Sequence, residues 1–163
     1  MTTARSLLVD PETPGFYHCI SRCVRRAWLC GVDPYSGASY EHRRAWVEQR
    51  LLELAEIFSV GVYAYAVMSN HLHVVLRLDP TAAATWTDEK VAVRWFRLFP
   101  ATANGELDEA GCRVKEQTLL GSAERLIACR LRLGSLAWFM KAINEPIARR
   151  ANREDACTGR FWD

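Results

Sequence analysis

Two histidines separated by a single residue, His71 and His73, are the side chains of this chain best suited to metal chemistry. They stand in the segment 63–79, where apolar and aromatic residues on both sides of Ser69 and Asn70 predict two strands joined by a tight turn. Residues two apart on a strand point to the same face, so the two imidazoles are neighbours. Neutral imidazoles can ligate one divalent cation and leave positions open for a phosphate oxygen and water. The alternative is a pair of partly buried histidines that bind no metal.

The segment 16–24 is predicted to form another strand of the same sheet. Its alternating pattern places His18, Ile20 and Arg22 together on one face. Arg22 either points at a bound anion or lies near a sheet edge in water, and the sequence favours neither interpretation.

The clearest helix is predicted at 41–58, before the histidine-bearing hairpin. Its apolar stripe, at helical spacing, consists of Val47, Leu51, Leu54, Ala55 and Phe58. Arg43 and Arg44 lie off this stripe, so we expect them on a solvated face rather than in contact with DNA. The helix must pack on the sheet through the stripe.

The second half of the chain is predicted to be helical. A last helix begins near Ser135, and Pro146 inside it lacks the N–H that would bond the preceding turn. We therefore expect a kink or a restart of that helix near Asn144. Before it, the pattern predicts a helix at 90–98, a polar connector at 104–111 and a second helix at 114–133.

A strand, a helix, two hairpin strands and then further helices give an α+β order with an antiparallel sheet. This order is compatible with a ferredoxin-like arrangement, with helices packed on one face, the two histidines on a central strand and extra C-terminal helices. The length of 163 residues suits one domain with a real core. We therefore predict a single domain over 1–163.

Composition narrows the class of protein. The net charge of +2 does not by itself indicate a nucleic-acid binder, but 18 of the 21 cationic side chains are Arg, the better bidentate partner for phosphate. The six cysteines form no CxxC pair and follow no secretory signal, so we expect reduced thiols and a cytoplasmic location. No apolar run approaches the roughly 20 residues that span a bilayer, so we expect no membrane segment.

Three stretches of the chain resemble one family of transposases. They are YHCISR at 17–22, AYAVMSNHLHVVL at 64–76 and the closing segment 135–162, which ends in TGRFW. They are similar to the strand signatures, the catalytic helix and the following loop of the IS200-like transposases. That group is named for its single catalytic tyrosine and its His-hydrophobe-His motif, and it includes the transposases associated with repetitive extragenic palindromes. Residues 80–130 match less specifically.

The resemblance implies a ferredoxin-like, usually dimeric protein that cleaves and rejoins single-stranded DNA, often beside a hairpin. It implies Mg²⁺ or Mn²⁺ at His71 and His73, and histidine ligation fits Mn²⁺ better because Mg²⁺ prefers oxygen ligands. In the family's chemistry a tyrosine hydroxyl attacks the scissile phosphate, forms a 5′-phosphotyrosine and frees a 3′-hydroxyl. The metal polarises the phosphoryl oxygens.

The chain departs from the family at the nucleophile. The resemblance puts Ile147 where the catalytic tyrosine belongs, and isoleucine cannot attack a phosphate. The tyrosines and their positions are Tyr17, Tyr35, Tyr40, Tyr63 and Tyr65. Those at 63 and 65 are expected to be buried in a strand and the one at 17 to pack, while those at 35 and 40 could reach a site. The catalytic residue is therefore unknown from the sequence.

The family takes its third metal ligand from a polar residue about one turn past the tyrosine. Ala151 stands four residues after Ile147, so Asn152 is the nearest polar candidate and we assign it to the metal site. Asn144 and Glu145 are the alternatives. Similar members of the family continue beyond the Gly-Arg-Phe-Trp string, so we also expect this chain to be truncated at its C-terminal end.

DNA binding is expected at two groups of arginines, beside the first strand and on the last helix. They are Arg22, Arg25, Arg26, Arg149, Arg150 and Arg153. For the last helix the alternative is a solvated face balanced by acidic neighbours. Three functions remain open: a transposase acting on single-stranded or hairpin DNA, with a homodimer possible; a remnant that binds DNA without strand transfer; and, ranked last, a metal-dependent phosphoesterase.

Overall fold

A computed structural model describes residues 9–10, 12–24 and 27–163. The chain is α+β, with a small antiparallel sheet and six helices in that part of it. It divides into two compact units. The sheet unit comprises Phe16–Ala55, Gly61–Arg77 and Met140–Asp163, and the helical unit comprises Met1–Gly15, Glu56–Val60 and Leu78–Phe139. The single domain over 1–163 stays a prediction.

Three strands form the sheet, in the order β1-β3-β2. They are β1 (Gly15–Arg22), β2 (Val60–Val67) and β3 (His71–Leu78). The N–H of Met68 donates to the carbonyl of His71 at 2.8 Å and closes the turn between β2 and β3. The predicted hairpin and first strand are therefore confirmed, and β3, which carries both histidines, is the middle strand.

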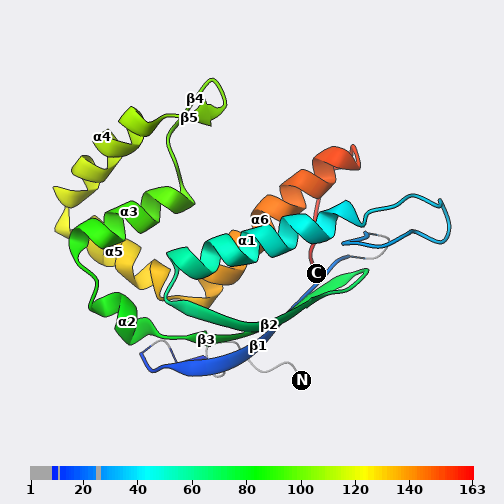
Figure 1. Cartoon of the computed structure of the whole chain (residues 1–163), viewed down its shortest axis with the longest axis horizontal. Coiled ribbons are helices and arrows are strands. Elements are labelled where there is room, and N and C mark those ends of the chain that lie inside the picture. The colour runs from blue at the N-terminus through cyan, green and yellow to red at the C-terminus, as the bar shows by residue number, and fades with distance from the viewer. Residues whose placement is uncertain (1–8, 11, 25–26) are drawn as a thin grey trace. The chain divides into compact units, whose positions relative to one another are not determined.

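Two helices, α1 (His42–Ile57) and α6 (Leu136–Glu154), cover one face of the sheet (Figure 1). Burial alternates along β3: Leu72, Val74 and Leu76 are fully buried, whereas Val75 between them is 37% exposed. The covering helices bury Val47, Leu51 and Leu54 from α1 and Ile143, Ile147 and Ala151 from α6. The other face of β3 carries His71, His73, Val75 and Arg77.

The C-terminal residues lie beside β1. Trp162 forms an antiparallel bridge with Cys23, and the N–H of Asp163 donates to the carbonyl of Arg22 at 2.7 Å. The N–H of Cys23 donates to the carbonyl of Asn70 instead, on the β3 side. Consecutive residues direct their backbone groups to opposite strand edges, so the C-terminal segment lies on the edge of β1 away from β3.

Of the kink or restart expected near Asn144, the restart does not occur, because Pro146 does not interrupt the last helix. α6 runs continuously from Leu136 to Glu154. Pro146 has no N–H for the carbonyl of Ala142, and the guanidinium of Arg50 on α1 donates to that carbonyl at 3.1 Å. The side chain of another helix therefore replaces the missing backbone bond.

Arg43 is fully buried, so its predicted place on a solvated face is wrong. Its guanidinium donates to Glu154 at 2.9 Å, to Asp155 and to the carbonyl of Trp28 at 2.8 Å. It also lies over the ring of Tyr40, 4.3 Å from the centroid. These contacts join the start of α1 to the end of α6, and each of the three guanidinium nitrogens donates to an acceptor.

The helical unit holds the remaining elements. They are α2 (Pro80–Ala84), α3 (Asp88–Leu98), β4 (Thr102–Ala103), β5 (Glu106–Leu107), α4 (Glu109–Leu120) and α5 (Ala123–Leu133). The hydroxyl of Thr87 accepts from the N–H of Lys90, so the predicted helix start is confirmed. The helix predicted at 114–133 is two helices, which separate at Gly121 and Ser122.

The connector at 104–111 contains a short β-hairpin that was not predicted from the sequence. Asn104 and Gly105 have positive φ angles of 54° and 86° and form the turn of the β4–β5 hairpin. Asn-Gly is favoured at such turns because both residues tolerate that backbone conformation. Within the same unit, Arg130 of α5 donates to the carbonyl of Ala83 at 3.2 Å and pairs with Asp88 at 2.6 Å.

None of the helices in the described part of the chain combines the length and the apolar character needed to cross a membrane.

Candidate metal and nucleic-acid site

Three histidines gather on the face of the sheet opposite α1 and α6. His18 of β1 and His73 of β3 lie with Nε2 and Nδ1 2.9 Å apart and with their rings stacked at a centroid distance of 5.1 Å. The ring of His71 meets that of His73 edge-on at 4.7 Å. The sequence placed His71 and His73 together, but it did not show that His18 joins them.

Asn70 contacts the outermost histidine of this cluster. Its carbonyl oxygen Oδ1 lies 2.7 Å from Nδ1 of His71. A carbonyl oxygen only accepts hydrogen bonds, so Nδ1 of His71 carries the proton. In a neutral imidazole the other nitrogen, Nε2, then holds a free lone pair.

His73 is the most crowded of the three side chains. Desolvation lowers its pKa below the ordinary histidine value, and the charges that His71 and His18 would carry lower it further. A lowered pKa favours the neutral ring at neutral pH. Neutral imidazole is the form that binds a metal ion.

The donor set of this face fits a divalent cation with two protein ligands and open coordination positions. The two imidazoles of β3 are adjacent, and the ring nitrogens that face Asn70 and His18 are already engaged. Among the residues that the structure describes, no group of three or more His, Cys, Asp and Glu side chains is arranged to hold a metal ion. Any further ligands would therefore come from water or a phosphate oxygen.

Asn152, predicted as the third ligand, lies near the end of α6. Its amide nitrogen donates to the carbonyl of Gly159 at 2.9 Å, and its amide oxygen accepts from the thiol of Cys157. α6 lies against the covered face of the sheet, where Asn144 donates to the hydroxyl of Ser21 at 2.8 Å. No contact joins Asn152 to the histidines in the described part of the chain, and its assignment stays a prediction.

The two alternative ligands also lie on α6. Glu145 pairs with Arg149 on the exposed side of that helix. Asn144 has its amide oxygen buried without a hydrogen-bond partner among the described residues, while its backbone carbonyl accepts from Trp162 at 2.7 Å. Both therefore belong to a helix that covers the face of the sheet opposite the histidines.

The residue at the expected nucleophile position, Ile147, is 3% exposed and belongs to the core. The predicted burial of two tyrosines is wrong: Tyr63 is 64% exposed and Tyr65 is 41% exposed. Tyr63 meets Phe16 edge-on at 5.4 Å, and Tyr35 in the loop before α1 is 95% exposed.

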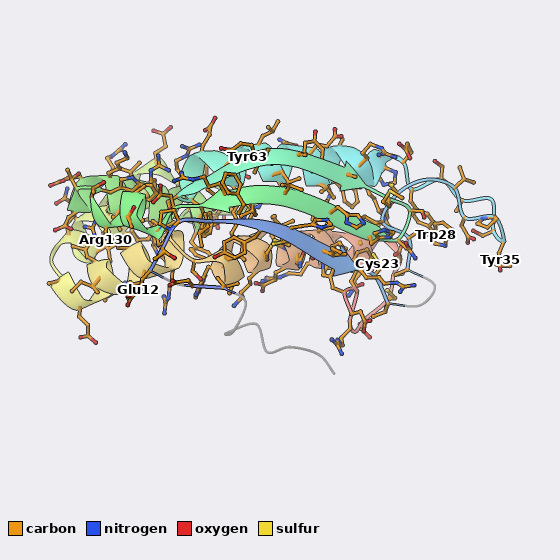
Figure 2. The ribbon with its side chains drawn as sticks, turned by 90° about the horizontal axis from the view of Figure 1, so that it is seen from below. Glu12, Cys23, Trp28, Tyr35, Tyr63 and Arg130 are labelled. Carbon is orange, nitrogen blue, oxygen red and sulfur yellow. The ribbon has the colours of Figure 1, made fainter. Side chains whose placement is uncertain are left out.

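A groove of about 1080 Å³ begins at the turn between β2 and β3. It is lined by Arg22, Cys23, Val24, Ala27, Trp28, Asp33, Tyr35, Ser69, Asn70 and Asp163. Figure 2 shows Trp28 and Tyr35 beyond the end of the sheet at which Cys23 lies. Asn70 both lines the groove and contacts His71, so the groove adjoins the histidine cluster.

The thiol in the wall of the groove is not a nucleophile. Burial raises the pKa of Cys23 to about 12, against a smaller opposing effect of Arg43. The thiol therefore stays protonated at neutral pH. Cys23, Cys30, Cys112, Cys129 and Cys157 form no disulfide bond.

Of the arginine group beside the first strand, the structure describes only Arg22. Arg22 is exposed and lines the groove. Arg25 and Arg26 lie outside the described residues. Their assignment to DNA stays a prediction.

The second arginine group lies along the outer side of α6. Arg149 pairs with Glu145, and Arg150 lies 3.8 Å from the ring centroid of Trp46 on α1. Arg153 is exposed. The pairing of Arg149 and the stacking of Arg150 are what a solvated helix face would show, and the assignment of this group to DNA stays a prediction.

No protein-family model, curated protein or solved structure matches this chain.

Proposed function

We propose that this protein binds single-stranded or hairpin DNA and acts on a backbone phosphate with the help of a divalent cation held by His71 and His73. The observation that carries the proposal is the gathering of His18, His71 and His73 on the sheet face opposite the helices, next to an aromatic groove. The resemblance to IS200-like transposases points to the same chemistry.

The strand order supports a ferredoxin-like interpretation of the sheet unit. The strand, helix, strand, strand, helix order ends in a C-terminal segment bridged to the free edge of β1, and both helices cover one face. A ferredoxin-like fold has this βαββαβ order. It would explain why β3 lies in the middle and presents its histidines away from the helices.

The groove suits an unpaired strand better than a duplex. Tyr35 and Trp28 offer aromatic faces on which bases can stack, and Arg22 offers a guanidinium for a phosphate. Asp33 and Asp163 also line the groove and disfavour phosphates near them. A bound Mg²⁺ or Mn²⁺ would polarise the phosphoryl oxygens next to the histidines.

The nucleophile that we assign is the hydroxyl of Tyr35. It is 95% exposed and lines the groove that adjoins the histidine cluster, whereas Ile147 is buried in the core. Attack of this oxygen on a phosphate would form a 5′-phosphotyrosine and release a 3′-hydroxyl, as in the family. A homodimer and a cytoplasmic location remain part of the proposal.

A second candidate is a DNA-binding remnant that holds the strand and has lost strand transfer. Burial of Ile147 at the position of the family's tyrosine favours it. The two candidates share the binding step and differ in the covalent step. A metal-dependent phosphoesterase would cut without any covalent intermediate.

The test is incubation with Mn²⁺ and an end-labelled single-stranded hairpin, read by denaturing gel and by mass spectrometry of the protein. Cleavage with an adduct on Tyr35, abolished by Tyr35→Phe and by His71→Ala, supports the transposase proposal. Binding without cleavage supports the remnant, and cleavage without an adduct supports a phosphoesterase. His42→Ala is the matched control, since His42 pairs with Glu154 away from the cluster. Absence of hairpin binding would overturn the proposal.

A further inference from the structure

Each histidine of the β3 pair has a polar side chain of another element beside its Nδ1 atom. Asn70 lies 2.7 Å from Nδ1 of His71, and His18 lies 2.9 Å from Nδ1 of His73. The same nitrogen of each histidine is therefore engaged, by groups from different elements. This pairing determines which nitrogen of each ring remains for a cation.

For His71 the outcome follows from the chemistry of Asn70. The amide oxygen can only accept, so Nδ1 of His71 donates and Nε2 is left unprotonated. A ligating histidine commonly donates its second N–H to a carbonyl or carboxylate, which fixes both the tautomer and the ring orientation. Asn70 supplies such a carbonyl.

For His73 the partner is another imidazole, which can donate or accept. If Nε2 of His18 donates, His73 must carry its own proton on Nε2 and has no free lone pair. If Nε2 of His18 accepts, His73 donates from Nδ1 and its Nε2 is free, as in His71. Only the second arrangement gives two ligating nitrogens of the same kind on adjacent same-face residues.

We propose that Asn70 and His18 are positioning residues, which accept hydrogen bonds from Nδ1 of His71 and His73 and so leave both Nε2 atoms free to bind one divalent cation. The inference rests on the cation site of the proposed function. His18 then belongs to the site as a hydrogen-bond acceptor rather than as a third ligand. Asn70 links the site to the groove, because it lines both.

The first test reads the tautomers directly, by long-range ¹H–¹⁵N correlation spectra of the full chain at a pH well above the ordinary histidine pKa of about 6.5. We expect His71 as the Nδ1–H form without metal, and both His71 and His73 as Nδ1–H forms when diamagnetic Mg²⁺ or Zn²⁺ is added. An Nε2–H form of His71, or of His73 with metal bound, would overturn the proposal.

The second test measures Mn²⁺ affinity by electron paramagnetic resonance. Asn70→Ala and His18→Phe remove the acceptors and should weaken binding by roughly 10- to 100-fold. Asn70→Asp and His18→Gln keep an acceptor oxygen and should retain most of the affinity. Rescue by these two variants separates positioning from a structural role, because a merely structural effect would not depend on the acceptor.

Neighbouring exposed residues provide matched controls. Ser69→Ala changes the same turn, and Ile20→Ala changes an exposed residue two positions from His18 on β1. Neither should alter Mn²⁺ affinity. Equal affinity in the wild type, Asn70→Ala and His18→Phe would overturn the proposal, as would a wild-type protein that binds no Mn²⁺.

A separate measurement, the binding of hairpin DNA, tests the proposed function. Mn²⁺ binding with the expected tautomers but no DNA binding would overturn the proposed function and leave the positioning roles standing. If the Asn70→Ala and His18→Phe variants cleave DNA as well as the wild type does, the positioning roles would be overturned and the proposed function would stand.

Discussion

The two faces of β3 differ completely in what they contact, although they alternate along one strand of eight residues. On one face Leu72, Val74 and Leu76 are fully buried under α1 and α6. On the other face His73 forms ring contacts with both His71 and His18. The period of two in a strand thus separates the residues that stabilise the fold from those that can do chemistry. If this separation holds, substitutions on the two faces should have different consequences.

The largest difference is expected between neighbouring residues of β3. Leu76→Ala should lower the free energy of unfolding by about 4 kcal/mol, because it leaves a cavity at a fully buried site. Val75→Ala, on the open face, should cost less than about 1 kcal/mol. Chemical denaturation measures both values. Similar losses at the two positions would contradict the separation of the faces.

The stability of the face covered by α1 and α6 should also depend on Arg43. Arg43→Met removes the buried cation between α1 and α6 and should cost about 3 kcal/mol, because Glu154 and Asp155 lose their partner while they stay partly buried. Arg44→Met is the matched control at the next position, where the side chain is 41% exposed. If Arg44→Met lowers the free energy of unfolding as much as Arg43→Met does, burial of the side chain does not determine the loss of stability.

Titration should reveal a buried thiol on the covered side. Burial raises the pKa of Cys23 to about 12 from an ordinary 9.0, so above pH 9 the unfolded chain loses this proton while the folded chain keeps it. Stability should therefore fall by up to about 1.4 kcal/mol per pH unit as the pH rises from 9 towards 12. Urea unfolding of the wild type and Cys23→Ala compares the two slopes. An unchanged slope in Cys23→Ala would contradict the assignment.

A smaller effect should appear inside α6. Arg50→Met leaves the carbonyl of Ala142 without its donor and should cost about 1 kcal/mol. In a Pro146→Ala background the backbone N–H of residue 146 can donate instead, so the same Arg50→Met change should cost less. A double-mutant cycle measures the coupling. Additive losses would show that Arg50 does not compensate for the proline.

Local signals predicted much of the fold. The alternation in 63–79 and the stripe in 41–58 correctly gave the β2–β3 hairpin and α1, and Thr87 correctly marked the start of α3. The hairpin at Asn104 and Gly105 also depends on neighbouring residues alone, so the Asn-Gly pair could have predicted it.

The parts that could not be predicted depend on residues far apart in the chain. His18 reaches His73 only through the pairing of β1 with β3, and one sequence does not give that register. Arg43 lies off the apolar stripe of its helix and is buried because the end of α6 supplies its partners. Tertiary context overrides helical periodicity in such cases.

The most direct test of the central claim compares the wild type with the double variant His71→Ala/His73→Ala. We measure Mn²⁺ affinity by electron paramagnetic resonance and the free energy of unfolding by urea denaturation. The account predicts that the variant loses Mn²⁺ binding while its stability stays within about 1 kcal/mol of the wild type. Unchanged Mn²⁺ affinity in the variant would contradict the claim that this face of β3 holds the cation.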